Sequence, residues 1–163
     1  MAYLSQTMNA FTQSPILGFV DLVPSPNVVA ALLSPSSSAV VQVGTAVKLI
    51  TGDSALPMVD STSGPTDGPV WGVIPYNNRK NLYTAGDVIN VALTNTFICL
   101  KCSAAVARND KVTTTAATSS ADPTVATVAT ASTQYVTGVA IDSSSGANQL
   151  LRIRVSPSFN SGV

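Results

Sequence analysis

The sequence predicts an all-β protein, and three observations support this fold class. Val and Thr, which favour strands, account for 21 and 18 of the 163 residues. Glu is absent, and the other residues that favour long exposed helices are few. Short apolar runs are separated by turn signals along most of the chain. Together these patterns predict a small β-barrel or sandwich of two similar β-units, preceded by an extended N-terminal arm with one short helix.

Residues 1–38 form the predicted arm. Proline interrupts their apolar residues, and no clean strand or helix period runs through residues 1–23, so this part is expected to be extended. Its large side chains need a surface, either the arm's own domain or a neighbouring subunit or partner. The candidate interface residues are Tyr3, Leu4, Met8, Phe11, Ile16, Leu17 and Phe19.

The one helix predicted in the arm runs from Asn27 to Leu33. Ser25 would be its N-cap and Pro26 its first residue, and Pro35 would follow its end. The serine-rich segment 34–38 is then expected to link the arm to the body. No stretch has the pattern of a secretory signal or of a membrane span, so neither export nor a membrane partner is expected.

Residues 39–163 form the predicted β-rich body. In the last strand expected there, Leu151 and Ile153 face one way, and Arg152 and Arg154 face the other. The short strands expected in the body lie within residues 41–49, 70–76, 87–93, 96–100, 135–141 and 150–155.

The body contains an internal repeat. Residues 38–47 align without gaps on residues 103–112, with four of ten pairs identical. At a similar distance downstream, residues 70–74 match residues 136–140. Each half closes with an alternating apolar strand, which indicates two similar β-units packed against each other.

The tract Thr113–Gln134 is rich in Thr, Ala and Ser. Such a composition is typical of a flexible surface loop or a weak hairpin. The alternative is an outward projection that meets solvent or a cell surface.

Composition argues against catalysis. The chain has no His, the commonest general base and metal ligand. Cys99 and Cys102 are expected to be buried free thiols, because their flanks resemble a strand and no further ligands exist for zinc. The Asp residues lie in or beside turns, where Asp makes local hydrogen bonds. Trp71 is expected to be a core or interface aromatic. We therefore expect no enzyme, no cofactor and no metal.

Charge is sparse and balanced. Charged residues make up 10% of the chain, where an ordinary soluble domain has about 25%, and eight Lys and Arg offset eight Asp. No net field would attract nucleic acid, so no nucleic-acid partner is expected. The surface is either kept wet by Ser, Thr and Asn or covered by another protein.

Short phrases over residues 39–155 resemble the decoration, or cement, proteins of tailed-bacteriophage capsids. The residues that carry the resemblance are 43–47 (VGTAV), 71–74 (WGVI), 86–91 (GDVINV), 104–112 (AAVARNDKV), 137–142 (TGVAID) and 151–155 (LRIRV). The arm has no counterpart among these phrases. At Asn109–Asp110 the family's Gly-Asp turn is replaced, but Asn tolerates the left-handed backbone.

The resemblance implies a virion protein without catalysis and a β-tulip-like body. It would be made in the host cytoplasm and would bind the major capsid protein on the outer surface of the assembled shell. There it would bridge capsomers as a homo-oligomer, a trimer more often than a dimer. An alternative is a head-fibre or tail component that binds a host receptor or glycan through the Thr113–Gln134 tract and aromatics such as Tyr76 and Tyr83. A further alternative is a bacterial carbohydrate-binding or adhesin module, which the missing signal sequence disfavours.

Overall fold

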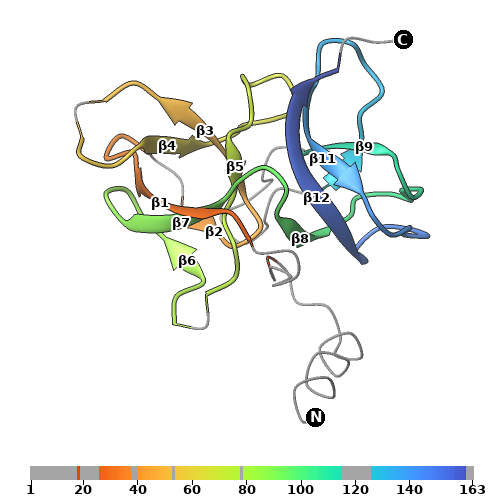
Figure 1. Cartoon of the computed structure of the whole chain (residues 1–163), viewed down its shortest axis with the longest axis horizontal. Coiled ribbons are helices and arrows are strands. Elements are labelled where there is room, and N and C mark those ends of the chain that lie inside the picture. The colour runs from red at the N-terminus through yellow and green to blue at the C-terminus, as the bar shows by residue number, and fades with distance from the viewer. Residues whose placement is uncertain are drawn as a thin grey trace.

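The computed structural model describes residues 18, 26–37, 40–52, 54–77, 79–114 and 126–160. The described residues contain strands and no helix, which confirms the predicted all-β class (Figure 1). In chain order the strands are β1 (Val28–Leu33), β2 (Val41–Gln42), β3 (Ala46–Ile50), β4 (Met58–Ser61), β5 (Gly72–Val73), β6 (Leu82–Tyr83), β7 (Val88–Ala92), β8 (Phe97–Lys101), β9 (Lys111–Thr114), β10 (Ala126–Val128), β11 (Tyr135–Ala140) and β12 (Leu150–Phe159).

The first half of the body is a closed five-stranded barrel in the order β1-β4-β3-β5-β7. The barrel closes through a parallel pairing of β1 with β4, whereas its other pairings are antiparallel. Alternate residues of these strands point inward, as β-branched and aliphatic side chains on a pleated strand do. The short β2–β6 ribbon adds two more buried side chains, Val41 and Tyr83, to the same core.

The second half is an open five-stranded sheet in the order β10-β9-β11-β12-β8. All of its pairings are antiparallel, and β12 is its longest strand. Within the Thr113–Gln134 tract, residues 113–114 lie in β9 and residues 126–128 form β10. The two strands pair from Ala126–Thr114 to Val128–Val112. This pairing supports the hairpin interpretation of the tract at its base.

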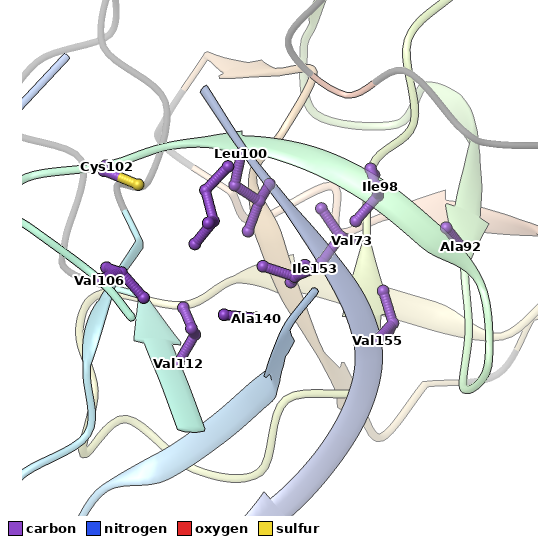
Figure 2. Close-up of a cluster of buried hydrophobic side chains, with 11 residues drawn as sticks. Val73, Ala92, Ile98, Leu100, Cys102, Val106, Val112, Ala140, Ile153 and Val155 are labelled. Carbon is purple, nitrogen blue, oxygen red and sulfur yellow. The ribbon is translucent and has the colours of Figure 1, made fainter. Parts of the chain in front are cut away.

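The barrel covers the inner face of the open sheet. Val73 of β5 and Ala92 of β7 lie on the outside of the barrel and are fully buried. They belong to the same cluster as Ile98, Leu100 and Ile153 of the open sheet, and Figure 2 shows these side chains converging from the two halves. The two sheets therefore share a core, which the open sheet could not complete alone.

The helix predicted over Asn27–Leu33 is wrong, because this segment forms strand β1. β1 pairs with β7 from Val28–Ala92 to Leu32–Val88 and also pairs with β4, so the barrel begins inside the segment that was assigned to the arm. The capping signal at Ser25–Pro26 is local and weak. It is outweighed by two strand pairings and by burial of alternate side chains, Ala31 and Leu33 among them.

Two glycines allow neighbouring strands to approach closely. A Cβ at Gly72 would lie 2.5 Å from the carbonyl oxygen of Ala92, and a Cβ at Gly138 would lie even closer to that of Arg154. Both contacts are to backbone, which cannot swing aside as a side chain can. Glycine is therefore required where β5 meets β7 and where β11 meets β12.

We expect Gly138→Ala to lower the free energy of unfolding by roughly 1–3 kcal/mol, because the added methyl group forces β11 away from β12. Urea denaturation followed by circular dichroism would measure the change. Gly64→Ala is the matched control, since a Cβ there meets nothing within 4 Å. Equal stability of the two variants would contradict the close approach of β11 and β12.

Candidate functional site

The seven predicted interface residues of the arm lie outside the described residues. Their contact with a subunit or partner therefore stays a prediction. The structure does describe Gly18, which lies within the same apolar segment.

Gly18 attaches the N-terminal segment to the body. Its N–H donates to the carbonyl oxygen of Cys99 at 2.7 Å, and its own carbonyl accepts from the N–H of Tyr76 at 2.6 Å. Gly18 has a φ of +71°, and a Cβ there would lie 2.9 Å from the Tyr76 nitrogen. At this residue the segment folds against its own chain, between β8 and the loop that follows β5. Sequence reasoning missed Gly18, although an isolated glycine among large apolar residues is a signal of close backbone approach.

The bond to Gly18 lies on the outer edge of β8. The Cys102 N–H donates to the carbonyl of Gln149, its register partner next to β12. Hydrogen-bonded positions alternate along an antiparallel pair, so residues 98, 100 and 102 bond toward β12. Cys99 is therefore a position whose backbone groups point away from β12. The N-terminal segment covers this edge at Gly18, and a covered edge is protected from pairing with other chains.

The outer face of the barrel carries an apolar row across four neighbouring strands. Val88, Leu32, Met58 and Ile50 are register partners on β7, β1, β4 and β3. Val88 is 60% exposed, and the other three are half-buried. Val28, which is also on the outer side of β1, is 38% exposed. Of this row, Val88 is the side chain most exposed to a neighbouring surface.

The outer face of the open sheet differs in being cationic. Lys111, Val139, Arg154 and Phe97 are register partners on β9, β11, β12 and β8. Lys111 and Arg154 are exposed, and Val139 and Phe97 are half-buried between and beside them. We call these four residues the basic row. The sequence had already indicated that Arg154 faces away from the core, but the strand neighbours of Arg154 could not be identified without the fold.

Three other described cations have a carboxylate partner. Arg152 donates two hydrogen bonds to Asp142, both at 3.1 Å. Lys48 Nζ lies 2.7 Å from Asp67, and Lys80 Nζ lies 2.6 Å from Asp87.

Two of these pairs change carboxyl pKa values. The Lys80 ammonium and the Thr84 N–H hold the pKa of Asp87 below its ordinary value. Burial alone would raise the pKa of Asp67, but hydrogen bonds from Lys48 and from Ser63 outweigh it and lower the pKa. Asp67 and Asp87 thus make local turn contacts, as the sequence predicts for Asp in such positions.

Neither cysteine forms a disulfide, and both are buried, as predicted. Burial raises the pKa of the Cys102 thiol, and a hydrogen bond with Ser144 opposes this in part. A thiol with a raised pKa is a poor nucleophile at neutral pH. Trp71 is half-buried and packs against the barrel core.

Within the part of the chain that the structure describes, no three His, Cys, Asp or Glu side chains gather where they could hold a metal ion. The same residues include no helix of a length and hydropathy suited to crossing a membrane.

Comparison with known proteins identifies a matching family and a solved structure with a similar fold. The profile of the XM1 gp53 minor capsid protein family matches residues 14–155. The fold is similar to the crystal structure of the head fiber gp8.5 N base of bacteriophage phi29, with a TM-score of 0.50 and 17% sequence identity. That similarity covers 82% of this chain and 97% of the phi29 chain. No curated protein matches the sequence.

These findings define the class as a structural protein of a phage virion that is associated with the capsid. The resemblance to phage capsid proteins drawn from the sequence is confirmed at this level. Because the family profile covers most of its length, the chain belongs to the XM1 gp53 minor capsid protein family.

We expect Gly18→Ala to destabilise the protein by more than Gly86→Ala does. Both glycines have a positive φ, so each substitution costs about 1–2 kcal/mol of backbone strain. Only at Gly18 would the new Cβ also press on the backbone, since nothing lies within 4 Å of one at Gly86. Thermal unfolding of both variants measures the difference. A smaller loss for Gly18→Ala would contradict the attachment at Gly18.

We expect both thiols to react slowly with Ellman's reagent in the native protein and rapidly in guanidinium. Cys99 is 7% exposed and Cys102 is fully buried with a raised pKa, so Cys99 should react first. The variants Cys99→Ser and Cys102→Ser each keep one thiol and allow the two rates to be measured separately. Faster reaction of Cys102 would show that the core around it opens.

Proposed function

We propose that this protein binds the outer surface of the assembled capsid and stabilises the shell by bridging capsomers, as a cement protein does. Membership of a minor capsid protein family is the observation that carries this proposal. The composition supports it as well, because a chain with charge on only 10% of its residues can present faces that pack on protein.

The physical basis is distributed attachment. Packaged DNA pushes capsid subunits apart, and a small protein that contacts several subunits raises the energy needed to separate them. Many copies acting together stabilise the shell even if each contact is weak. No chemical transformation is needed, so we propose a protein without catalytic activity and without a cofactor.

The arm is the proposed main anchor on the shell. Its aromatic and aliphatic side chains would fill pockets on the major capsid protein, the usual pattern of strong contacts at interfaces. The attachment at Gly18 supports a separate role for the arm as anchor, because it fixes the point at which the N-terminal segment leaves the body. A trimer, or less often a dimer, would place several arms around one junction between capsomers.

A head fibre is the second candidate. The fold similarity to the N base of the phi29 head fiber favours it, since that protein is named as the base of a fiber. A fibre component would need the Thr113–Gln134 tract, Tyr76 or Tyr83 for adsorption to cells. Tyr76 is 39% exposed, whereas Tyr83 is 4% exposed and packs in the barrel core, which favours Tyr76 of the two.

We further propose that the body consists of two similar β-units. The barrel order β1-β7-β5-β3-β4 corresponds to the order β8-β12-β11-β9-β10 of the open sheet. The register of Val47 with Gly72 corresponds to that of Val112 with Gly138. In both halves the residue two positions beyond this glycine donates its N–H to a turn carbonyl at 2.9 Å. The β-tulip-like description of the body remains a prediction.

We expect deletion of residues 1–13 to reduce capsid occupancy at least tenfold while leaving the body folded. The deletion removes Tyr3, Leu4, Met8 and Phe11 but keeps Gly18 and its two backbone bonds. Purified capsids lacking the protein would be incubated with each variant, pelleted and quantified on a gel. A full-length variant with these four residues replaced by Ser separates side-chain anchoring from arm length.

Undiminished binding of both variants would overturn the arm as anchor. The same preparations separate the two candidate functions. A cement protein raises the temperature at which capsids release DNA and leaves adsorption to cells unchanged. A head-fibre component increases adsorption and leaves the release temperature unchanged.

A further inference from the structure

The basic row lies on the open sheet at the place that corresponds to an interface in the barrel half of the same molecule. In the open sheet the row runs through Lys111, Val139, Arg154 and Phe97. The corresponding register row of the barrel runs through Ala46, Val73, Ala92 and Val28, on β3, β5, β7 and β1.

The central part of the barrel row docks on the open sheet, whereas Val28 at its end is 38% exposed. Ala46, Val73 and Ala92 are fully buried, and Val73 and Ala92 enter the core cluster of the open sheet (Figure 2). Small and apolar residues suit that contact, because they meet the apolar inner side of a sheet. This fold therefore uses the outer face of these strands as a docking surface at least once.

The open sheet presents the corresponding face with different chemistry. Two cations replace Ala46 and Ala92, while an aliphatic residue, Val139, remains at the centre. Arg154 has no ion pair within the described part of the chain, and the Lys111 ammonium has only the Asn160 amide oxygen at 3.5 Å. The nearby Arg152 differs, since Asp142 already neutralises it.

We propose that the basic row is a docking surface for an acidic patch of the shell protein, with carboxylates placed on either side of a small apolar centre. This inference rests on the proposed binding to the capsid and names the face and the chemistry of the contact. Charge complementarity identifies the partner: Lys111 and Arg154 flank Val139 and lie two strands apart, about 10 Å between backbones. Two partner carboxylates at a matching spacing would pair with both cations, and the Arg154 guanidinium can hold one in a two-bond fork.

Protein is favoured over nucleic acid by the small number of cations. Tight binding to a nucleic-acid backbone uses several phosphate contacts, and the chain as a whole has no net charge. Two cations around an aliphatic and an aromatic residue instead match a protein surface of mixed character.

Arg154→Glu tests the proposal, with Arg79→Glu as the matched control. Both arginines are exposed, and both variants change the net charge equally, but Arg79 lies in a barrel loop between β5 and β6. The dissociation constant of full-length protein for capsids lacking it is measured at about 50 and about 500 mM salt, where the higher concentration screens exposed charges. We expect Arg154→Glu to weaken binding at least tenfold at low salt, Arg79→Glu to stay within twofold, and Arg154→Lys to retain most of the affinity.

Lys111→Glu should also weaken binding. Loss of binding in both variants would show that the effect of Arg154→Glu does not come from a folding defect of that variant alone. Binding of Arg154→Glu equal to that of the unchanged protein would overturn the docking face and leave capsid binding intact. No binding by the unchanged protein would overturn the proposed function together with this face. Binding of the unchanged protein to duplex DNA as tight as to capsids, lost in Arg154→Glu, would assign the row to nucleic acid and overturn the acidic protein partner.

Discussion

The contact between the outer face of the barrel and the inner face of the open sheet holds the two halves of the protein together. The open sheet has one apolar face and no second layer of its own, so it must bury that face against another element. Val73 and Ala92 provide the cover and are themselves fully buried. The same strands need Gly72, because β5 and β7 approach closely at that point. A shared core fixes the two halves relative to each other, whereas two loosely linked halves would rotate.

The strand content was predictable because local patterns determine it. Alternation of Leu151, Ile153 and outward Arg residues predicted β12 with the correct inner face. The helix over Asn27–Leu33 failed for the opposite reason: its strand depends on partners far along the chain, since Val28 pairs with Ala92. The capping signal at Ser25–Pro26 depends only on adjacent residues and carries no information about such partners. The order of strands in the two sheets was likewise beyond the sequence, because pairings such as β1 with β7 join residues about 60 positions apart.

The candidate surfaces, like the strand order, depend on residues that are far apart in the sequence. Arg152 and Arg154 are equivalent in the sequence, two residues apart on one strand. The structure distinguishes them, because Asp142 returns to pair with Arg152 and leaves Arg154 beside Val139 and Phe97. Gly18 is a similar case, since its role depends on two backbone partners that lie far away in the chain. Composition could indicate that the protein acts by contact, but it could not locate the contacts.

Sparse charge gives the few unpaired cations a large influence on how the protein associates. The described ion pairs neutralise Lys48, Lys80 and Arg152 locally, so these residues contribute little to the field at a distance. An uncharged surface with exposed Val88 beside Leu32 would tend to associate with any apolar neighbour. The charges of Lys111 and Arg154 make the contact selective. A cationic partner surface is repelled, whereas an anionic one offsets the cost of removing water from these side chains. The apolar features thus supply attraction that is weakly selective, and the basic row supplies the discrimination between one neighbouring surface and another.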